Sequence, residues 1–148
     1  MMNKLKALKL LIVGVRIALG LLFVYGGVQK FIPKPPRPQT SEIQEVPEHI
    51  VKIKAFIGGM KQTGYFWEFL GIAEILCGIL LLSQVFSLLG AVMMVPLTLN
   101  IFFFHLFLEP HEMGELFLTG LYLVGNLFLI GIDYPKLKST FLTYKLTT

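Results

Sequence analysis

The sequence is poor in charged residues and in cysteine, and both shortages restrict what this protein can be. Charged residues make up 15% of the 148 positions, whereas 55% are hydrophobic, and the mean hydropathy is +0.72. A soluble chain of this length could not bury so much apolar surface, so the composition indicates a membrane protein. Cys77 is the single cysteine, which excludes an internal disulfide and a thiol pair for exchange chemistry.

Apolar runs are what the sequence has in abundance. Four such segments cover about residues 8–31, 65–82, 85–108 and 116–132. Each is close to the ~20 residues that a helix needs to cross a bilayer. Backbone groups in hydrocarbon must be hydrogen-bonded within their own segment, so each span must be helical. The sequence predicts an all-α fold, an integral membrane four-helix bundle that forms one domain over residues 1–148.

The loop between the first two spans, residues 33–63, divides into two parts. Residues 33–38 are rich in proline and predict a stiff, extended backbone. Beyond residue 47, apolar residues recur at helical spacing and lysines lie off that face. This pattern predicts a short amphipathic helix, either on the membrane surface or as a cap over the mouth of the bundle. The apolar face consists of Ile50, Ile53, Ile57 and Met60.

The basic residues lie mostly beside the spans, where they can meet lipid headgroups, so the net charge of +4 does not indicate nucleic acid as a partner. Lysines flank both ends of the chain, and residues 109–115 contain neither Lys nor Arg. Residues 33–63 also carry basic side chains, so the charge counts on the two sides are nearly balanced. The first span usually dominates orientation, which favours N-in/C-in in a bacterial inner (cytoplasmic) membrane. The flanking lysines are Lys4, Lys6, Lys9, Lys136, Lys138 and Lys145.

Three polar residues inside the spans are expected near one depth. A rise of about 1.5 Å per residue places Arg16, Glu74 and Asn126 roughly 9–12 Å from the inner ends of their spans. Opposite charges at matched depth predict an intramembrane ion pair between Arg16 and Glu74, with Asn126 as a hydrogen-bond partner. Such a clasp would lock the bundle. The alternatives are a proton or substrate site, and an Arg16 side chain that extends alone to the lipid headgroups.

A second polar layer is expected further out. Tyr25, Glu68 and Asn100 fall roughly 21–26 Å from the inner face, and Lys30 and His105 lie just beyond them. The layer combines hydrogen-bond donors, acceptors and a group that can titrate near neutral pH. These five residues are the candidates for binding a quinone-like ligand.

The end of the third span and the loop after it carry a cluster of His and Glu residues, which are residue types that bind metal ions. Pro110 interrupts the helix, so the cluster cannot lie on one regular face, and neither HExxH nor a paired ExxH motif is present. No metal site is therefore expected. An acidic interfacial loop or a quinone and proton site remain as alternatives. The cluster consists of His105, Glu109, His111 and Glu112.

Two short motifs resemble a known family. The first span contains Arg16, Gly20 and a closing Gly27-x-x-Lys30, and the second contains Glu74 followed by Gly78. These patterns, together with four spans and a long first loop, resemble the DoxX-like family of small membrane proteins. The resemblance covers most of the chain except residues 33–61, which form a longer and more proline-rich loop than the family usually has.

The resemblance implies a four-helix membrane bundle and two kinds of role. Some DoxX-like proteins are associated with quinone-linked sulfur oxidation, others with membrane complexes for oxidative-stress defence. The sequence has no haem, flavin or iron–sulfur signature, so electrons would need a bound quinone or a redox partner protein. We therefore expect a quinone-linked, redox-associated subunit. The alternatives are a non-catalytic factor that assembles or stabilises a partner protein, and a small transporter. Catalytic residues stay unassigned.

Overall fold

The computed structural model describes residues 2–33 and 46–141. Within these residues every regular element is an α-helix, so the predicted all-α class is confirmed. The predicted extended proline-rich stretch falls mainly on residues 34–45, outside the described residues. The helices are α1 (Met2–Gln29), α2 (Glu48–Gln62), α3 (Phe66–Leu82), α4 (Ser87–Leu108), α5 (Met113–Ile132) and α6 (Tyr134–Phe141).

Four of these helices coincide with the four apolar segments of the sequence. By length and composition, α1, α4 and α5 can each cross a membrane. Helix α3 has 17 residues, which at ~1.5 Å per residue makes it slightly shorter than the hydrocarbon core. It counts as a fourth span when joined with α2, from which it is bent by 90°. The chain is thus an integral membrane protein with three to four candidate spans.

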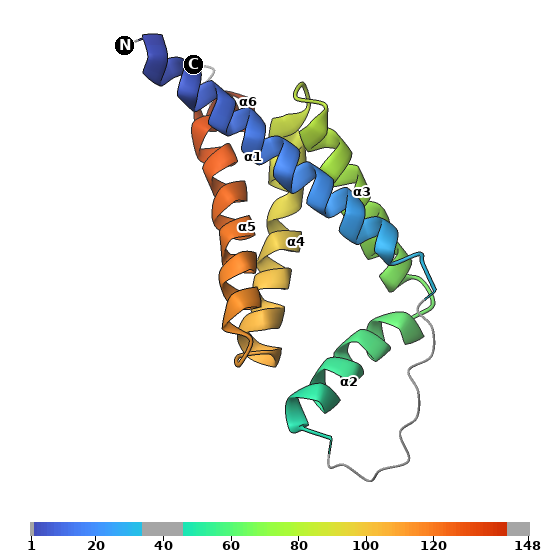
Figure 1. Ribbon diagram of the computed structural model, residues 1–148. Coiled ribbons are helices and arrows are strands. Elements are labelled where there is room, and N and C mark those ends of the chain that lie inside the picture. Colours follow the sequence, from blue (N-terminus) through green and yellow to red (C-terminus); the bar gives the residue numbers. More distant parts are fainter. Residues whose placement is uncertain (1, 34–45, 142–148) are drawn as a thin grey trace, which may run out of the picture.

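The bundle is assembled from neighbouring helix pairs (Figure 1). Helix α1 runs diagonally along α3, while α4 and α5 lie side by side. The start of α1 and helix α6 lie at one end of the bundle, and α2 lies at the other end. Many large apolar side chains on the spans are exposed, as expected when lipid is the solvent. The small buried core consists of Leu19, Phe23, Cys77, Leu81, Ala91, Met94 and Leu129.

Glycines allow α1 and α3 to approach each other closely at two levels. A Cβ atom on Gly27 would lie 2.6 Å from the carbonyl oxygen of Gly71, and one on Gly78 would lie 2.6 Å from the carbonyl oxygen of Gly20. No real side chain fits at such a distance. The two glycine pairs therefore set the register of the antiparallel α1–α3 pair, as small residues commonly do between membrane helices.

Helix α2 matches the predicted amphipathic helix. Its turn into α3 contains Gly64 at φ +76°, a conformation that glycine adopts without strain. The hydroxyl of Thr63 accepts a hydrogen bond at 3.0 Å from the backbone N–H of Phe66, the first residue of α3. The sharp bend places α2 roughly perpendicular to α3.

Helix α6 was not predicted from the sequence. Four of its eight residues, Lys136, Lys138, Ser139 and Thr140, are polar or charged, so it lacks the hydropathy of a span. The backbone carbonyl of Asp133 accepts hydrogen bonds from the N–H groups of Lys136 and Leu137, at 3.0 and 3.1 Å. A helix this short depends on such local contacts with the end of α5, which hydropathy does not reveal.

Candidate functional site

The predicted ion pair between Arg16 and Glu74 is wrong, because each residue has a different partner. The guanidinium of Arg16 donates from Nη2 to a carboxylate oxygen of Asp133 at 2.9 Å and from Nη1 to the amide oxygen of Gln84 at 3.4 Å. Arg16 therefore connects α1 with the α3–α4 turn and with the junction of α5 and α6.

Glu74 instead forms an ion pair with Lys30. The ammonium of Lys30 lies 2.5 Å from a carboxylate oxygen of Glu74, and the two side chains are only 15% and 5% exposed. The pair joins the residue directly after α1 to the middle of α3. It neutralises both charges at a level where neither is well solvated.

The register of α1 against α3 explains why the depth estimate failed. Gly27 lies against Gly71 and Gly20 against Gly78, so residues in contact have numbers that sum to about the same value. Arg16 consequently lies level with the end of α3, near Gln84, rather than level with Glu74. The estimate assumed that the inner ends of both spans lie at one depth, whereas α1 is a 28-residue helix that extends past the inner end of α3.

Asn126 does not join either ion pair. It is fully buried on α5, and its amide Nδ2 donates to the hydroxyl of Thr98 on α4 at 3.4 Å. The Asn126 Oδ1 atom has no hydrogen-bond partner in the part of the chain that is described. This contact links α4 and α5 in the apolar interior, which is the role of a structural clasp.

The five residues of the predicted outer layer do not converge on one site. Tyr25 is 67% exposed on α1, and Lys30 is held by Glu74. Glu68 lines a cavity that Lys30 also lines, whereas Asn100 lines a different, apolar groove. His105 lies next to Glu109, with Nδ1 2.8 Å from a carboxylate oxygen, although the contact lacks hydrogen-bond geometry.

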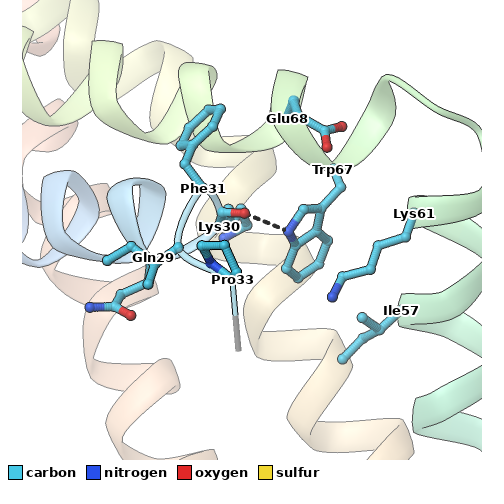
Figure 2. Close-up of a pocket in the computed structure, with 9 residues that line it drawn as sticks. Gln29, Lys30, Phe31, Pro33, Ile57, Lys61, Trp67 and Glu68 are labelled. Atoms are coloured by element: carbon cyan, nitrogen blue, oxygen red, sulfur yellow. Dashed lines mark hydrogen bonds between the residues drawn. The ribbon is translucent and has the colours of Figure 1, made fainter. Parts of the chain in front are cut away.

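The first cavity surrounds Trp67 where α1, α2 and α3 meet (Figure 2). It has a volume of about 330 Å³. The indole N–H of Trp67 donates to the backbone carbonyl of Lys30 at 3.1 Å. The ammonium groups of Lys30 and Lys61 lie 5.3 and 5.0 Å from the centroid of the ring, within cation–π range. Trp67 therefore fastens the end of α1 to the corner between α2 and α3.

The second cavity is a larger apolar groove between α2, α3 and α4. It has a volume of about 510 Å³, within the size range of small-molecule sites. Pro96 lies inside α4 and in the wall of the groove, where its missing N–H leaves the carbonyl of Val92 without the usual donor. Asn100 and Phe56 also line an adjoining cavity of about 250 Å³. The groove is lined by Phe56, Met60, Phe66, Phe69, Leu70, Ala73, Cys77, Met93, Pro96, Leu97 and Asn100.

The His and Glu residues around the α4–α5 loop are spread over several contacts. The ring of His111 contacts that of His49 on α2, with 6.3 Å between centroids. Among residues 2–33 and 46–141, no group of three or more His, Cys, Asp or Glu side chains could hold a metal ion. The loop thus serves as a contact surface for the start of α2.

Sequence reasoning missed Asp133, Gln84 and Trp67 as interior partners. Asp133 and Gln84 lie at the ends of apolar segments, where polar residues are ordinarily solvated, so only the tertiary contact with Arg16 identifies them. Trp67 stands at the start of an apolar segment, where tryptophan ordinarily indicates only the membrane interface.

Comparisons with known proteins agree with this architecture. The DoxX family model matches residues 11–106, which include about two thirds of α1, all of α2 and α3, and nearly all of α4. No curated protein and no solved structure matches the chain.

Proposed function

The chain belongs to the DoxX family, and on that premise we propose that it binds a quinone-class ligand in the apolar groove between α2, α3 and α4. In this role it would be the membrane subunit of a redox system, with a partner protein supplying the electrons. The single observation that carries the proposal is the groove itself, about 510 Å³ in volume and lined almost entirely by apolar side chains.

The lining of the groove suits a ring with a hydrocarbon tail. Phe56, Phe66 and Phe69 supply aromatic surface, against which a flat ring can stack. Asn100 is the polar side chain in the wall, and its amide can donate a hydrogen bond to a quinone carbonyl. The groove continues past Asn100 into the adjoining cavity along α4, towards Phe103 and Phe107. That continuation offers a path for an isoprenoid tail.

The chain's own residues favour binding rather than electron storage. Lys30 and Glu74 neutralise each other, as do Arg16 and Asp133, so the interior offers few groups for proton transfer. A bound quinone would supply the two-electron chemistry, while the protein positions its ring and excludes water.

The test uses the single tryptophan of the chain. Phe66, in the groove wall, is the neighbour of Trp67 in the sequence, so a bound quinone should quench tryptophan fluorescence. The protein purified in mild detergent should retain extractable quinone and be quenched by added short-chain quinone in a saturable way. The variant Ala73→Phe, which fills the groove, should lose both properties.

Two further variants keep this test decisive. Ile79→Phe places the same ring on the exposed face of α3, and it should bind quinone as the unmodified protein does. Asn100→Leu should weaken binding without altering thermal unfolding. Equal quinone content in the unmodified protein, Ala73→Phe and Asn100→Leu would contradict the proposal.

A second candidate function is a non-catalytic role in assembling or stabilising a partner protein. It is favoured by the use of four polar residues within the spans, Arg16, Glu74, Thr98 and Asn126, for contacts with other parts of the bundle. A protein that lacks quinone, shows no saturable quenching, and co-purifies with one stoichiometric partner would support this second function over the first.

We also propose N-in/C-in orientation in a bacterial inner membrane. The lysines near the start of α1 and on α6 lie at the same end of the bundle (Figure 1), and the positive-inside rule favours the cytoplasm for that end. Helix α2 would then lie at the outer surface.

A further inference from the structure

Helix α2 carries two lysines that have no carboxylate partner among the described residues. Lys52 forms an ion pair with Glu48 at 2.8 Å, and this contact lowers the pKa of the Glu48 carboxyl. Within residues 2–33 and 46–141, Lys54 and Lys61 form no ion pair, and the ammonium of Lys61 rests near the ring of Trp67. The helix therefore presents two uncompensated positive charges.

Both of these lysines line one cavity between α2 and the end of α4. The cavity has a volume of about 450 Å³. Its remaining wall combines apolar side chains with one acid, Glu109, whose carboxylate already lies 2.8 Å from His105. Gly58 contributes no side chain, and a Cβ built there would meet nothing within 4 Å. The apolar part of the wall consists of Ile50, Ile53 and Ile57.

The position of α2 places this cavity near the surface of a bilayer. Helix α2 is bent by 90° from α3, so it runs along the membrane plane when α3 crosses the membrane. Lys61 and Ile57 extend from α2 towards Trp67 (Figure 2), a residue type that prefers the headgroup region. A cavity with cationic and apolar walls at that depth matches the two halves of a phospholipid.

We propose that this cavity binds one anionic phospholipid, with its phosphate between Lys54 and Lys61 and its upper acyl carbons on the three isoleucines. The isoleucine wall distinguishes a lipid from a soluble phosphate, which would gain nothing from apolar surface. The proposal does not depend on the quinone function, since the two cavities have no lining residue in common.

The test measures lipid binding to the intact protein by native mass spectrometry in detergent. Phosphatidylglycerol should bind more tightly than phosphatidylcholine, and Lys54→Gln/Lys61→Gln should weaken phosphatidylglycerol binding about 30-fold, roughly 5-fold for each lysine. Lys52→Gln is the matched control, because that lysine lies on the same helix but is paired with Glu48. It should leave the binding close to that of the unmodified protein.

A second pair of variants changes the cavity without changing charge. Gly58→Leu should fill the cavity and reduce phosphatidylglycerol binding, whereas Gly59→Leu, on a neighbouring position where a Cβ also meets nothing within 4 Å, should not. Thermal unfolding checks that each variant is folded. Equal binding of the two lipids, an equal loss in Lys52→Gln, or complete displacement of the lipid by excess inorganic phosphate would overturn the proposal.

Discussion

Lys30 and Glu74 are 44 positions apart in the chain, yet their side chains meet as an ion pair in the contact between α1 and α3. The same lysine places its ammonium 5.3 Å from the ring of Trp67 and accepts the indole N–H at its backbone carbonyl. One residue at the end of α1 thus fastens that helix both to the middle of α3 and to the corner that leads into α2.

Breaking this pair should destabilise the protein strongly. Lys30→Met leaves a carboxylate in an interior where it is poorly solvated, and Glu74→Gln leaves an ammonium there. We expect each change to cost about 3–5 kcal/mol of unfolding free energy. The double variant should lose less than the sum of the two single losses, measured by thermal unfolding in detergent. Strict additivity would show that the two side chains do not interact.

The two members of the Arg16–Asp133 pair should respond unequally. In Arg16→Met, Asp133 keeps Lys136, whose ammonium lies 2.7 Å from its other carboxylate oxygen, so the loss should be about 1.5–3 kcal/mol. In Asp133→Asn, the mostly buried guanidinium of Arg16 keeps only the hydrogen bond to Gln84 and a weakened contact with the new amide, and the loss should reach about 3–5 kcal/mol. Thermal unfolding of both variants gives the order, and the reverse order would contradict the contacts described.

Alanine at the close glycine contacts should weaken the α1–α3 interface. Gly27→Ala and Gly78→Ala each place a methyl group 2.6 Å from a backbone oxygen of the opposite helix, which forces the helices apart at a cost of about 1–3 kcal/mol. Gly14→Ala is the matched control on α1, the helix of Gly27, because a Cβ at Gly14 meets nothing within 4 Å. Its unfolding temperature should stay unchanged or rise slightly.

The proposed orientation can be tested by accessibility of single cysteines. In a Cys77→Ala background, a cysteine replacing Gln62 at the end of α2 should react with a membrane-impermeant reagent in intact cells. A cysteine replacing Lys138 on α6 should react only after the membrane is permeabilised. The opposite pattern would reverse the orientation, and labelling of both sites from one side would be inconsistent with α2 and α6 lying at opposite ends of the bundle.

Much of the architecture follows from the sequence alone. Continuous apolar runs predict the helices α1, α3, α4 and α5, because hydrocarbon allows no other backbone for such segments. The apolar spacing of Ile50, Ile53 and Ile57 predicts α2, and short motifs around Arg16 and Glu74 point to the family. That residues 1–148 form one domain stays a prediction.

The pairing of polar residues was decided only by the tertiary structure. Sequence position gives the depth of a side chain only if the inner ends of all spans lie at one level. The inner end of α1 extends past that of α3. The glycine contacts fix the position of α1 along α3. In this register Arg16 lies close to Asp133, and Lys30 lies close to Glu74. Hydropathy determined which segments enter the membrane, because it depends on composition over many residues. Close packing between particular backbones determined which charges meet, because a register is a property of two helices together.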